Sequence, residues 1–303
     1  MKVLITGGTG LVGRELSMKL RDKGYDVAIL SRSKKKNTEF QTYLWDPSRN
    51  SVDREAIQTS DIVVHLAGAN LSEKRWSEKQ KKLIIDSRVE TAKLLFNQFK
   101  KTKHRLKAFI SASAVNYYGV LTSEKIFSEN DPPASDFIGE TCILWEQSAN
   151  RFKHLKKRVV ILRTATVLSQ RGGALPKMSK PVKLGAGAPV GSGKQYMPWI
   201  HIDDICKIYI KAIEDTKMKG AYNAAAPEQV TNEYFMKTLA RVLGKPFLAP
   251  RVPAFVLKTL YGQMAELILK GSRVSTKKIE SAGYEFQITG LEDALKDLIK
   301  TGK

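Results

Sequence analysis

A glycine-rich turn near the start of the chain limits its possible folds more than any other feature. Gly7, Gly10 and Gly13 follow one another at intervals of three, between the apolar run at residues 3–5 and a helical pattern. In such a turn the first glycine permits the tight bend, the second admits a pyrophosphate, and the third lets the helix pack on the strand. The free N–H groups at the start of the helix then face the phosphates. We therefore predict a dinucleotide site formed by Gly7, Thr9, Gly10, Leu11, Val12 and Gly13.

The first half of the chain alternates between two periodicities. Short apolar runs, typical of strands buried on both faces of a parallel sheet, occur at residues 3–5, 27–30, 62–66, 108–110 and 159–162, with a weaker run at 43–45. The segments between them carry apolar residues at helical spacing, such as Val12, Leu16 and Leu20. Strands and helices in alternation predict an α/β fold with a doubly wound parallel sheet of the Rossmann type.

The pattern changes after about Thr164. Residues 169–198 are rich in glycine and proline, which predicts irregular loops and turns. Residues 199–213 predict a short strand followed by a helix, and residues 252–299 predict three helices, the first running through residues 252–269.

The chain shows no internal repeat and no long linker, so we expect two interwoven parts. Residues 1–167 plus about 198–226 are predicted to form a nucleotide-binding domain. Residues 168–197 plus 227–303 are predicted to form a smaller, mostly helical C-terminal domain.

The end of the second predicted strand indicates which dinucleotide to expect. A site for NAD needs an aspartate or glutamate there, about 20 residues after the turn. Here the segment is Ser31, Arg32 and Ser33 followed by three lysines, with no acid. A guanidinium can pair with a 2′-phosphate and stack on adenine, and the serines can donate hydrogen bonds. We predict that Ser31, Arg32 and Ser33 bind NADP(H); the alternative is a solvated basic turn.

Further short motifs run through the chain: His65-Leu66-Ala67-Gly68, Lys74-Arg75-Trp76, Ser87-Arg88, Ser111-Ala112-Ser113, Tyr117-Tyr118-Gly119, Trp145-Glu146, Leu162-Arg163-Thr164, Gly191-Ser192-Gly193, Trp199-Ile200-His201-Ile202-Asp203-Asp204 and Arg251-Val252-Pro253. Together with the glycine turn, in this order, they resemble the short-chain dehydrogenase/reductase superfamily. The resemblance is to its atypical, extended branch of epimerase-family proteins, which are similar to sugar-nucleotide epimerases. It extends over the whole chain and includes a family-specific C-terminal module.

The resemblance implies that NADP(H) lies in an extended groove and that the C-terminal domain holds a small-molecule substrate. It also implies roles for three groups of residues: Leu66, Ala67 and Gly68 along the cofactor, Ser113 at the superfamily's catalytic serine or threonine, and Arg163 and Thr164 on the nicotinamide side.

One departure from the superfamily affects catalysis. Its working pair is Tyr-x-x-x-Lys on the helix after the serine, where the lysine lowers the tyrosine pKa. That helix should lie at residues 136–146, and it contains neither tyrosine nor lysine. The equivalent pair is Phe137 with Thr141, or Ile138 with Cys142. A missing general acid costs about 10²–10⁴ in rate.

Ser113 and Tyr117 are therefore the candidate catalytic residues. Both follow the strand predicted at residues 108–110. Tyr118 matches a structural Tyr-Gly turn of the superfamily. His201 precedes the Asp203-Asp204 pair, which resembles a helix N-cap, so a structural role is favoured for the histidine.

Two hypotheses for the function follow. The first is an NADP(H)-dependent oxidoreductase or epimerase-like enzyme that acts on an unidentified small molecule. The second is a non-catalytic, NADP(H)-responsive regulatory or binding protein, for example one related to cell division. The retained Ser113 and the C-terminal domain favour the first hypothesis, and the absent Tyr-x-x-x-Lys pair favours the second.

The charge of the chain raises a third possibility. Lysine and arginine total 51 against 30 aspartates and glutamates, giving a formal net charge of +21. Such an excess suits a polyanionic partner, which can be a phosphorylated cofactor, a nucleic acid or a lipid surface. The basic runs at residues 79–82, 100–107 and 153–158 contain few aromatic residues. We therefore expect a solvated rim that steers anionic ligands, and no specific nucleic-acid complex.

The rest of the composition indicates the compartment in which we expect the protein to work. Cys142 and Cys206 are its two cysteines, so no disulfide framework is expected, which suits a reducing compartment. No signal peptide or membrane-spanning run is visible, and the four histidines lack ligand spacing. We predict a cytoplasmic monomer or homodimer that contacts no membrane and holds no metal.

Overall fold

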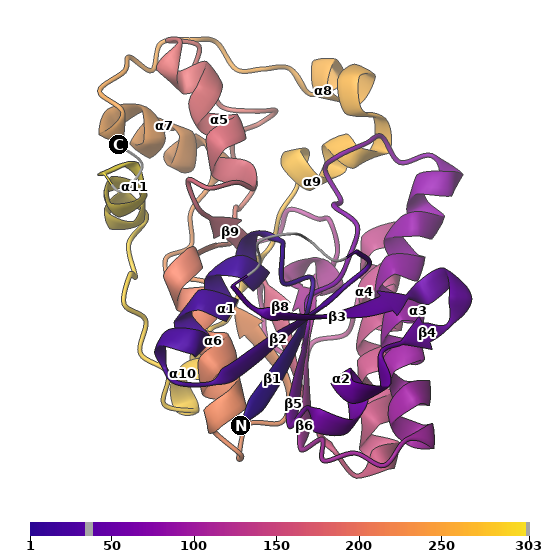
Figure 1. Cartoon of the computed structure of the whole chain (residues 1–303). Helices are drawn as coiled ribbons and strands as arrows, with labels where there is room; N and C mark the ends of the chain where they lie inside the picture. The colour runs from indigo at the N-terminus through magenta and orange to yellow at the C-terminus, as the bar shows by residue number, and fades with distance from the viewer. Residues whose placement is uncertain (34–38, 301–303) are drawn as a thin grey trace.

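An eight-stranded, mostly parallel sheet forms the centre of the molecule (Figure 1). The computed structural model describes residues 1–33 and 39–300. The strands follow the order β11-β8-β6-β5-β1-β2-β3-β4, and β3 and β4 pair antiparallel at one edge. Their bounds are β1 Lys2–Thr6, β2 Asp26–Ser31, β3 Gln41–Asp46, β4 Ser51–Val52, β5 Ile62–His65, β6 Ala108–Ala114, β8 Arg158–Thr164 and β11 Gly220–Ala224. The order reverses between β1 and β5, and the carboxyl ends of these two strands mark the switch point where such sheets bind ligands.

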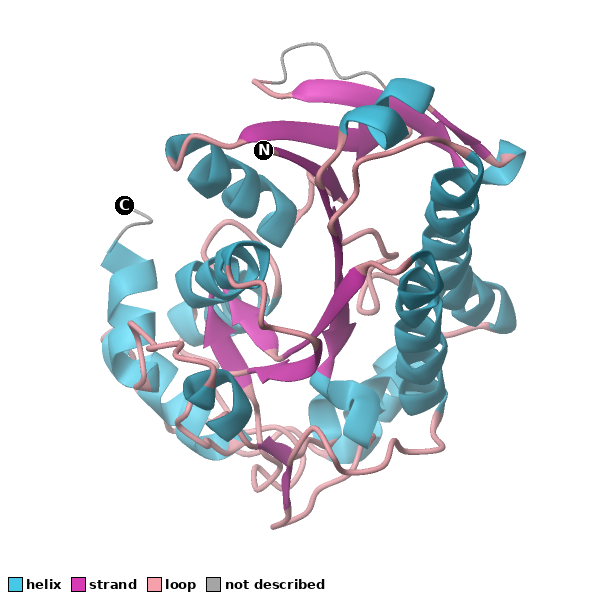
Figure 2. Ribbon diagram, turned by 90° about the horizontal axis from the view of Figure 1, so that it is seen from below, coloured by secondary structure: helices cyan, strands magenta, loops and turns pink. Residues whose placement is uncertain are grey.

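Helices cover both faces of this sheet (Figures 1 and 2). On one face lie α1 (Leu11–Asp22) and α6 (Ile202–Glu214); on the other lie α2 (Arg54–Thr59), α3 (Glu78–Lys101) and α4 (Phe137–Asn150). Alternate residues of β1 divide between two apolar cores: Val3 and Ile5 join the core of α1 and α6, and Leu4 joins the core of α3. The apolar runs are thus buried on both sides, and the predicted doubly wound α/β fold is confirmed.

The remaining elements form a smaller, mostly helical part. In Figure 1, α5, α7, α8 and α9 lie beyond the upper end of the sheet, and α10 and α11 lie on the side of α1 and α6. The bounds are α5 Ala174–Lys183, α7 Asn232–Val242, α8 Ala254–Tyr261, α9 Glu266–Leu269, α10 Lys277–Ser281, α11 Leu291–Lys300, β7 Ile126–Phe127, β9 Thr166–Leu168, β10 Trp199–His201 and β12 Arg273–Val274. Phe235 of α7 and Leu295 of α11 belong to the same apolar core as β1 and α6.

The prediction that residues 169–198 are irregular was wrong, because they contain α5. Leu175, Ser179 and Val182 are spaced for one helical face, and all three are buried. The glycines bracket this helix, with Gly173 before it and Gly185 after it. Helical burial of one apolar face therefore outweighs the local cost of the prolines inside the segment.

The prediction of three helices after residue 252 was also inaccurate. The first expected helix, at residues 252–269, is broken after Tyr261 by Gly262, whose φ is +59°. Only glycine adopts that left-handed backbone without strain. The tail consequently contains α8, α9, α10 and α11, with the short strand β12 between α9 and α10.

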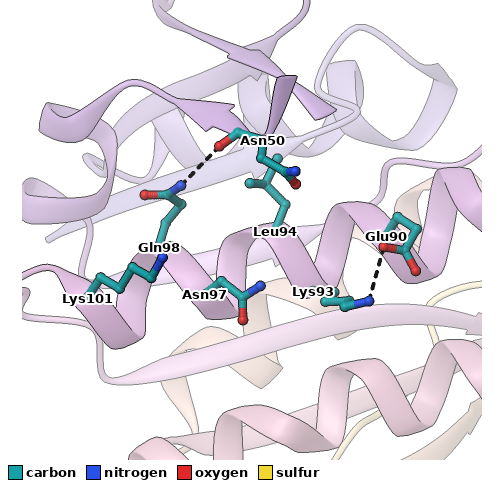
Figure 3. Close-up of a pocket in the computed structure, with 7 residues that line it drawn as sticks. All are labelled: Asn50, Glu90, Lys93, Leu94, Asn97, Gln98 and Lys101. Carbon is teal, nitrogen blue, oxygen red and sulfur yellow. Dashed lines mark hydrogen bonds and ion pairs between the residues drawn. The ribbon is translucent and has the colours of Figure 1, made fainter. Parts of the chain in front are cut away.

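A polar groove lies on α3, away from the switch point (Figure 3). Its volume is about 370 Å³, and it is lined by Asn50, Glu90, Lys93, Leu94, Asn97, Gln98 and Lys101. Gln98 Nε2 donates to the carbonyl oxygen of Asn50 over 3.2 Å, and Lys93 pairs with Glu90 over 3.4 Å. Six of these side chains come from the C-terminal half of α3, and Asn50 lies between β3 and β4, so the groove is not part of the candidate site.

Candidate functional site

The glycine turn between β1 and α1 forms a close-packed cradle with no room for side chains at two of its glycines. A Cβ atom built on Gly13 would lie 2.3 Å from the carbonyl oxygen of Gly7, and one built on Gly7 would lie 2.9 Å from the carbonyl carbon of Leu66. Gly10 is the N-cap of α1, no side chain of the described residues caps this helix, and its first turn contains no acid. The first N–H groups of α1 therefore remain free for a pyrophosphate, which the cradle fits.

The end of β2 presents the residues predicted to bind a 2′-phosphate. Ser31 is half-buried, and Arg32 and Ser33 are exposed. The backbone N–H of Ser33 donates to Ser31 Oγ over 3.4 Å. The lysines at positions 34–36 lie outside the described residues. No described carboxylate pairs with Arg32, so its guanidinium is available to an anionic ligand.

The start of the turn after β5 is fastened to the glycine turn. Thr6 Oγ1 accepts hydrogen bonds from the N–H groups of Leu66 and Ala67, each over 3.1 Å. Because both lone pairs of this oxygen are used, the Thr6 hydroxyl donates its proton to His65 Nδ1 over 2.8 Å. The imidazole proton is therefore on Nε2, which lies 3.3 Å from Thr91 Oγ1. Burial lowers the pKa of His65 to about 4, so the ring is neutral at physiological pH.

Ser113 lies at the carboxyl end of β6, where its hydroxyl is committed to a neighbour. It is 3% exposed, and Oγ donates to Glu146 Oε1 over 2.8 Å. Arg163 forms two bonds to the same carboxylate, from Nε at 2.8 Å and from Nη2 at 2.9 Å. A carboxylate held in this way keeps the serine proton on its side, so Ser113 can only accept a hydrogen bond from a ligand. Glu146 was not among the predicted site residues, although it belongs to the Trp145-Glu146 motif and is an acid within a largely apolar helix.

Tyr117 and Tyr118 flank the same arginine. The Tyr118 hydroxyl donates to Asn223 Oδ1 and accepts from Arg163 Nη1, both over 2.8 Å. Burial raises the pKa of Tyr118 to about 12. The Arg163 guanidinium carbon lies 3.4 Å from the centre of the Tyr117 ring. The half-buried Tyr117 has no hydrogen-bond partner for its hydroxyl among the described residues, which leaves this phenol free for a ligand. Thr164, predicted on the nicotinamide side, donates its hydroxyl to the carbonyl of Leu162.

The start of α4 is filled by aromatic and sulfur groups where the superfamily has its tyrosine and lysine. The Phe137 ring packs edge-on against Trp76, with centroids 5.1 Å apart. Thr141 Oγ1 donates to the carbonyl of Phe137 over 2.7 Å. Burial raises the pKa of the Cys142 thiol to about 12. In neither register does α4 offer a phenol or an amine.

Two segments of the smaller part reach this edge of the sheet. Gly172 and Gly173, just before α5, lie against Leu11, since Cβ atoms built on them would be 3.6 and 3.2 Å from its methyl carbons. Arg75, in the segment before α3, donates from Nε to the carbonyl of Leu260 over 2.8 Å and from Nη2 to that of Thr259. The chain segment at residues 74–76 is thereby joined to α8.

His201 has a structural role at α6, but not through the cap predicted for it. The histidine is itself the N-cap, with Nδ1 accepting from the N–H of Asp203 over 3.2 Å. Asp203 and Asp204 lie in the first turn of the helix, where acids are favourable. Within residues 1–33 and 39–300, no group of three or more His, Cys, Asp or Glu side chains is arranged to hold a metal ion. No described helix is both long and apolar enough to span a membrane.

Comparison with known proteins agrees with this geometry. The family described as "NAD dependent epimerase/dehydratase family" matches residues 3–225. The chain belongs to this family. A second match, to a domain of unknown function (DUF1731), covers residues 252–298 of this epimerase-family chain and corresponds to the family-specific C-terminal module. The resemblance drawn from the motifs is thus confirmed.

Several epimerase-family proteins match along their whole length. The Bacillus subtilis epimerase family protein YfhF is 35% identical over 305 residues, which cover 100% of this chain and 99% of the relative. The mouse epimerase family protein SDR39U1 is 34% identical over 307 residues, covering 99% and 100%. The crystal structure of human SDR39U1 (isoform 2) with NADPH aligns with a TM-score of 0.87 at 32% identity, over 99% of each chain.

Proposed function

We propose that the protein binds NADP(H) at the switch point and works as an atypical short-chain dehydrogenase/reductase, an oxidoreductase or epimerase-like enzyme acting on a small molecule. The observation that carries this proposal is the cradle of the glycine turn, with its uncapped helix N-terminus. The NADPH in the crystal structure of human SDR39U1 supports the choice of cofactor.

The residues proposed to hold the cofactor surround the carboxyl ends of β1, β2, β5 and β8: Gly7, Thr9, Gly10, Leu11, Val12, Gly13, Ser31, Arg32, Ser33, Leu66, Ala67, Gly68, Arg163 and Thr164. The exposed Arg32 suits the 2′-phosphate. When bound, the cofactor supplies or accepts a hydride. We place substrate binding in the C-terminal domain, residues 168–197 plus 227–303, because Gly173 and Arg75 join its helices to this edge.

Ser113 and Tyr117 have complementary parts in this proposal. The free Tyr117 hydroxyl transfers the proton that accompanies the hydride. The Arg163 guanidinium over its ring stabilises the phenolate that remains. Ser113, whose own proton points to Glu146, accepts a hydrogen bond from a hydroxyl or amide group of the ligand.

One observation favours the second candidate function, a non-catalytic NADP(H)-responsive protein. Phe137, which holds the tyrosine position in one of the two registers, packs against Trp76, so in that register an aromatic contact replaces the superfamily's phenol. A protein that only senses the cofactor has no need of a proton donor there.

The experiment that separates these functions combines binding with turnover. NADPH is titrated into the protein, and NADPH oxidation is then followed against a panel of carbonyl compounds and sugar nucleotides. Turnover that falls in Tyr117→Phe supports the enzyme. Tight binding without turnover across the panel supports the sensor. Failure to bind NADPH overturns both.

A further inference from the structure

A buried cation without an acidic partner among the described residues lies beside the turn that follows β5. Arg88, near the middle of α3, is 7% exposed. Its guanidinium donates to the carbonyl oxygens of Ile84 over 2.9 Å and Ala69 over 3.0 Å, and more weakly to the Ser87 hydroxyl. No carboxylate of the described residues pairs with it. Burial lowers the pKa of Arg88 to about 10, so the side chain stays charged at neutral pH. An unpaired buried charge costs free energy, which calls for an explanation of its presence.

The guanidinium is packed tightly between the turn and α4. A Cβ atom built on Gly68 would lie 3.0 Å from Arg88 Cζ and 3.2 and 3.3 Å from Nη2 and Nε. Gly68 therefore lies against the guanidinium plane. The Trp145 ring of α4 is 4.9 Å from Cζ, and α3 and α4 run side by side in Figure 1. Arg88, a residue of α3, thus contacts both Trp145 of α4 and Gly68 of the turn.

The turn at residues 66–69 is held at both ends. Thr6 binds the N–H groups at its start. At its end, the N–H of Ala69 donates to Ser87 Oγ over 2.8 Å, and the carbonyl of Ala69 accepts from Arg88. Consecutive residues of α3 therefore fix both backbone groups of Ala69, and Gly68 has no room to shift toward the guanidinium.

The place of this turn in the sheet indicates which part of the cofactor it faces. A dinucleotide bound across the switch point extends in both directions from its pyrophosphate at β1. The β2 side carries Arg32, which suits the adenosine 2′-phosphate. The turn after β5 lies on the opposite side, toward β6 and β8, and hence on the nicotinamide side.

We propose that Arg88 is a positioning residue for the nicotinamide half of the cofactor. Through Ala69 and Gly68 it holds residues 66–69 in the shape that this half of the cofactor needs. The inference rests on the proposed function and deepens it, since it assigns a buried residue of α3 to one half of the ligand.

The test compares two ligands that differ only in the nicotinamide end, NADPH and 2′-phospho-ADP-ribose. Arg88→Met is expected to weaken NADPH binding roughly tenfold while binding of 2′-phospho-ADP-ribose changes less than about twofold. Arg151→Met is the control, because Arg151, directly after α4, stacks on Phe96 of α3 at 4.6 Å, about two helical turns along α3 from Arg88. This control should bind both ligands as the native protein does. Thermal unfolding of each variant shows whether it is folded.

Two variants that avoid Arg88→Met, Gly68→Ala and Arg88→Lys, keep the test decisive if Arg88→Met is poorly stable, and a double-mutant cycle adds a further measurement if it is folded. Gly68→Ala alone forces a methyl group against the guanidinium and should weaken NADPH binding about fivefold. In the Arg88→Met background, Gly68→Ala should weaken NADPH binding less than about twofold, because the flexible methionine side chain can move away from the added methyl group. Arg88→Lys keeps the charge but loses the planar guanidinium with its paired N–H donors. Its affinity for NADPH should lie between those of the native protein and Arg88→Met.

The outcomes separate the two proposals. If the native protein binds neither ligand, the proposed function fails and this inference fails with it. If the native protein binds both, and Arg88→Met weakens both equally or neither, the inference is overturned while the proposed function stands. Additive effects of Gly68→Ala and Arg88→Met would equally overturn it, since they show that the two residues act independently.

Discussion

The two sides of the switch point use their polar groups in opposite ways. On the β1–β2 side, no described side chain caps the start of α1, and Arg32 is exposed. On the β6–β8 side, Ser113, Glu146 and Arg163 are buried and bonded to one another. Free donors on the first side suit a ligand, whereas the satisfied groups on the second side stabilise their own arrangement.

This difference indicates that the cofactor site can be complete without the side chains that proton transfer needs. The cradle needs only backbone geometry, which three glycines supply. Proton transfer needs a specific side chain with a suitable pKa, and the usual tyrosine of α4 is replaced by Phe137 or Ile138. The four predictions below test the contrast between the two sides, from the largest expected effect to the smallest.

The first prediction concerns the β6–β8 side. Glu146→Ala should lower the free energy of unfolding by about 3–5 kcal/mol, because it leaves Arg163 buried without its carboxylate. Urea denaturation measures this. Glu140→Ala, an exposed acid on the same helix, should change the free energy of unfolding by less than about 1 kcal/mol. If both variants are equally stable, the network does not stabilise its own arrangement and the contrast is lost.

The second prediction concerns His65, at the junction of the two sides. Its pKa of about 4 in the folded protein lies below the ordinary 6.5, so folding favours the neutral ring. The resulting stability is fully present above pH 6.5 and is lost as pH falls from 6.5 to about 4, by roughly 3 kcal/mol in total. Denaturation at a series of pH values measures the slope. His65→Gln should flatten it, and an unchanged slope in that variant would contradict the assignment.

The third prediction tests cofactor selectivity on the β1–β2 side. Arg32→Ala should weaken NADPH binding by about 1.5–3 kcal/mol, because it removes a charge-assisted pair with the 2′-phosphate. NADH, which lacks that phosphate, should bind the variant and the native protein alike. Titration of both cofactors against both proteins measures this. Equal affinity of the native protein for NADPH and NADH would remove the basis for assigning NADP(H).

The fourth prediction asks whether the β6–β8 side also takes part in chemistry. Ser113→Ala and Tyr117→Phe should each lower turnover roughly tenfold, because each removes a hydroxyl that faces the reacting groups in the proposal. NADPH affinity should stay nearly unchanged, since neither residue belongs to the cradle. Steady-state rates and cofactor titrations on a substrate found in the panel give both quantities. Unchanged turnover in both variants would show that this side is purely structural.

Much of the fold followed from local patterns. The sequence patterns predicted the apolar strands β1, β2, β5, β6 and β8 and the helix α1 where they occur. Burial on two faces and helical periodicity both appear as patterns among residues that are close together in the sequence. The glycine turn was equally local, since its sterics involve only the backbone of a few residues. Helix α5 was missed because glycine and proline around it hid an apolar face formed by Leu175 and Val182.

The sequence by itself determined the doubly wound sheet, the cradle for a pyrophosphate and the absence of the Tyr-x-x-x-Lys pair, since each depends on residue types at short spacing. Only the tertiary structure decided that Glu146 accepts the hydrogen bond of Ser113, 33 residues away, and that Arg88 lies against Gly68 with no acid of the described residues to balance its charge. Such partnerships depend on how helices α3 and α4 pack on the sheet. Packing brings together groups that no spacing along the chain relates, and burial then decides what each hydroxyl or charge can do.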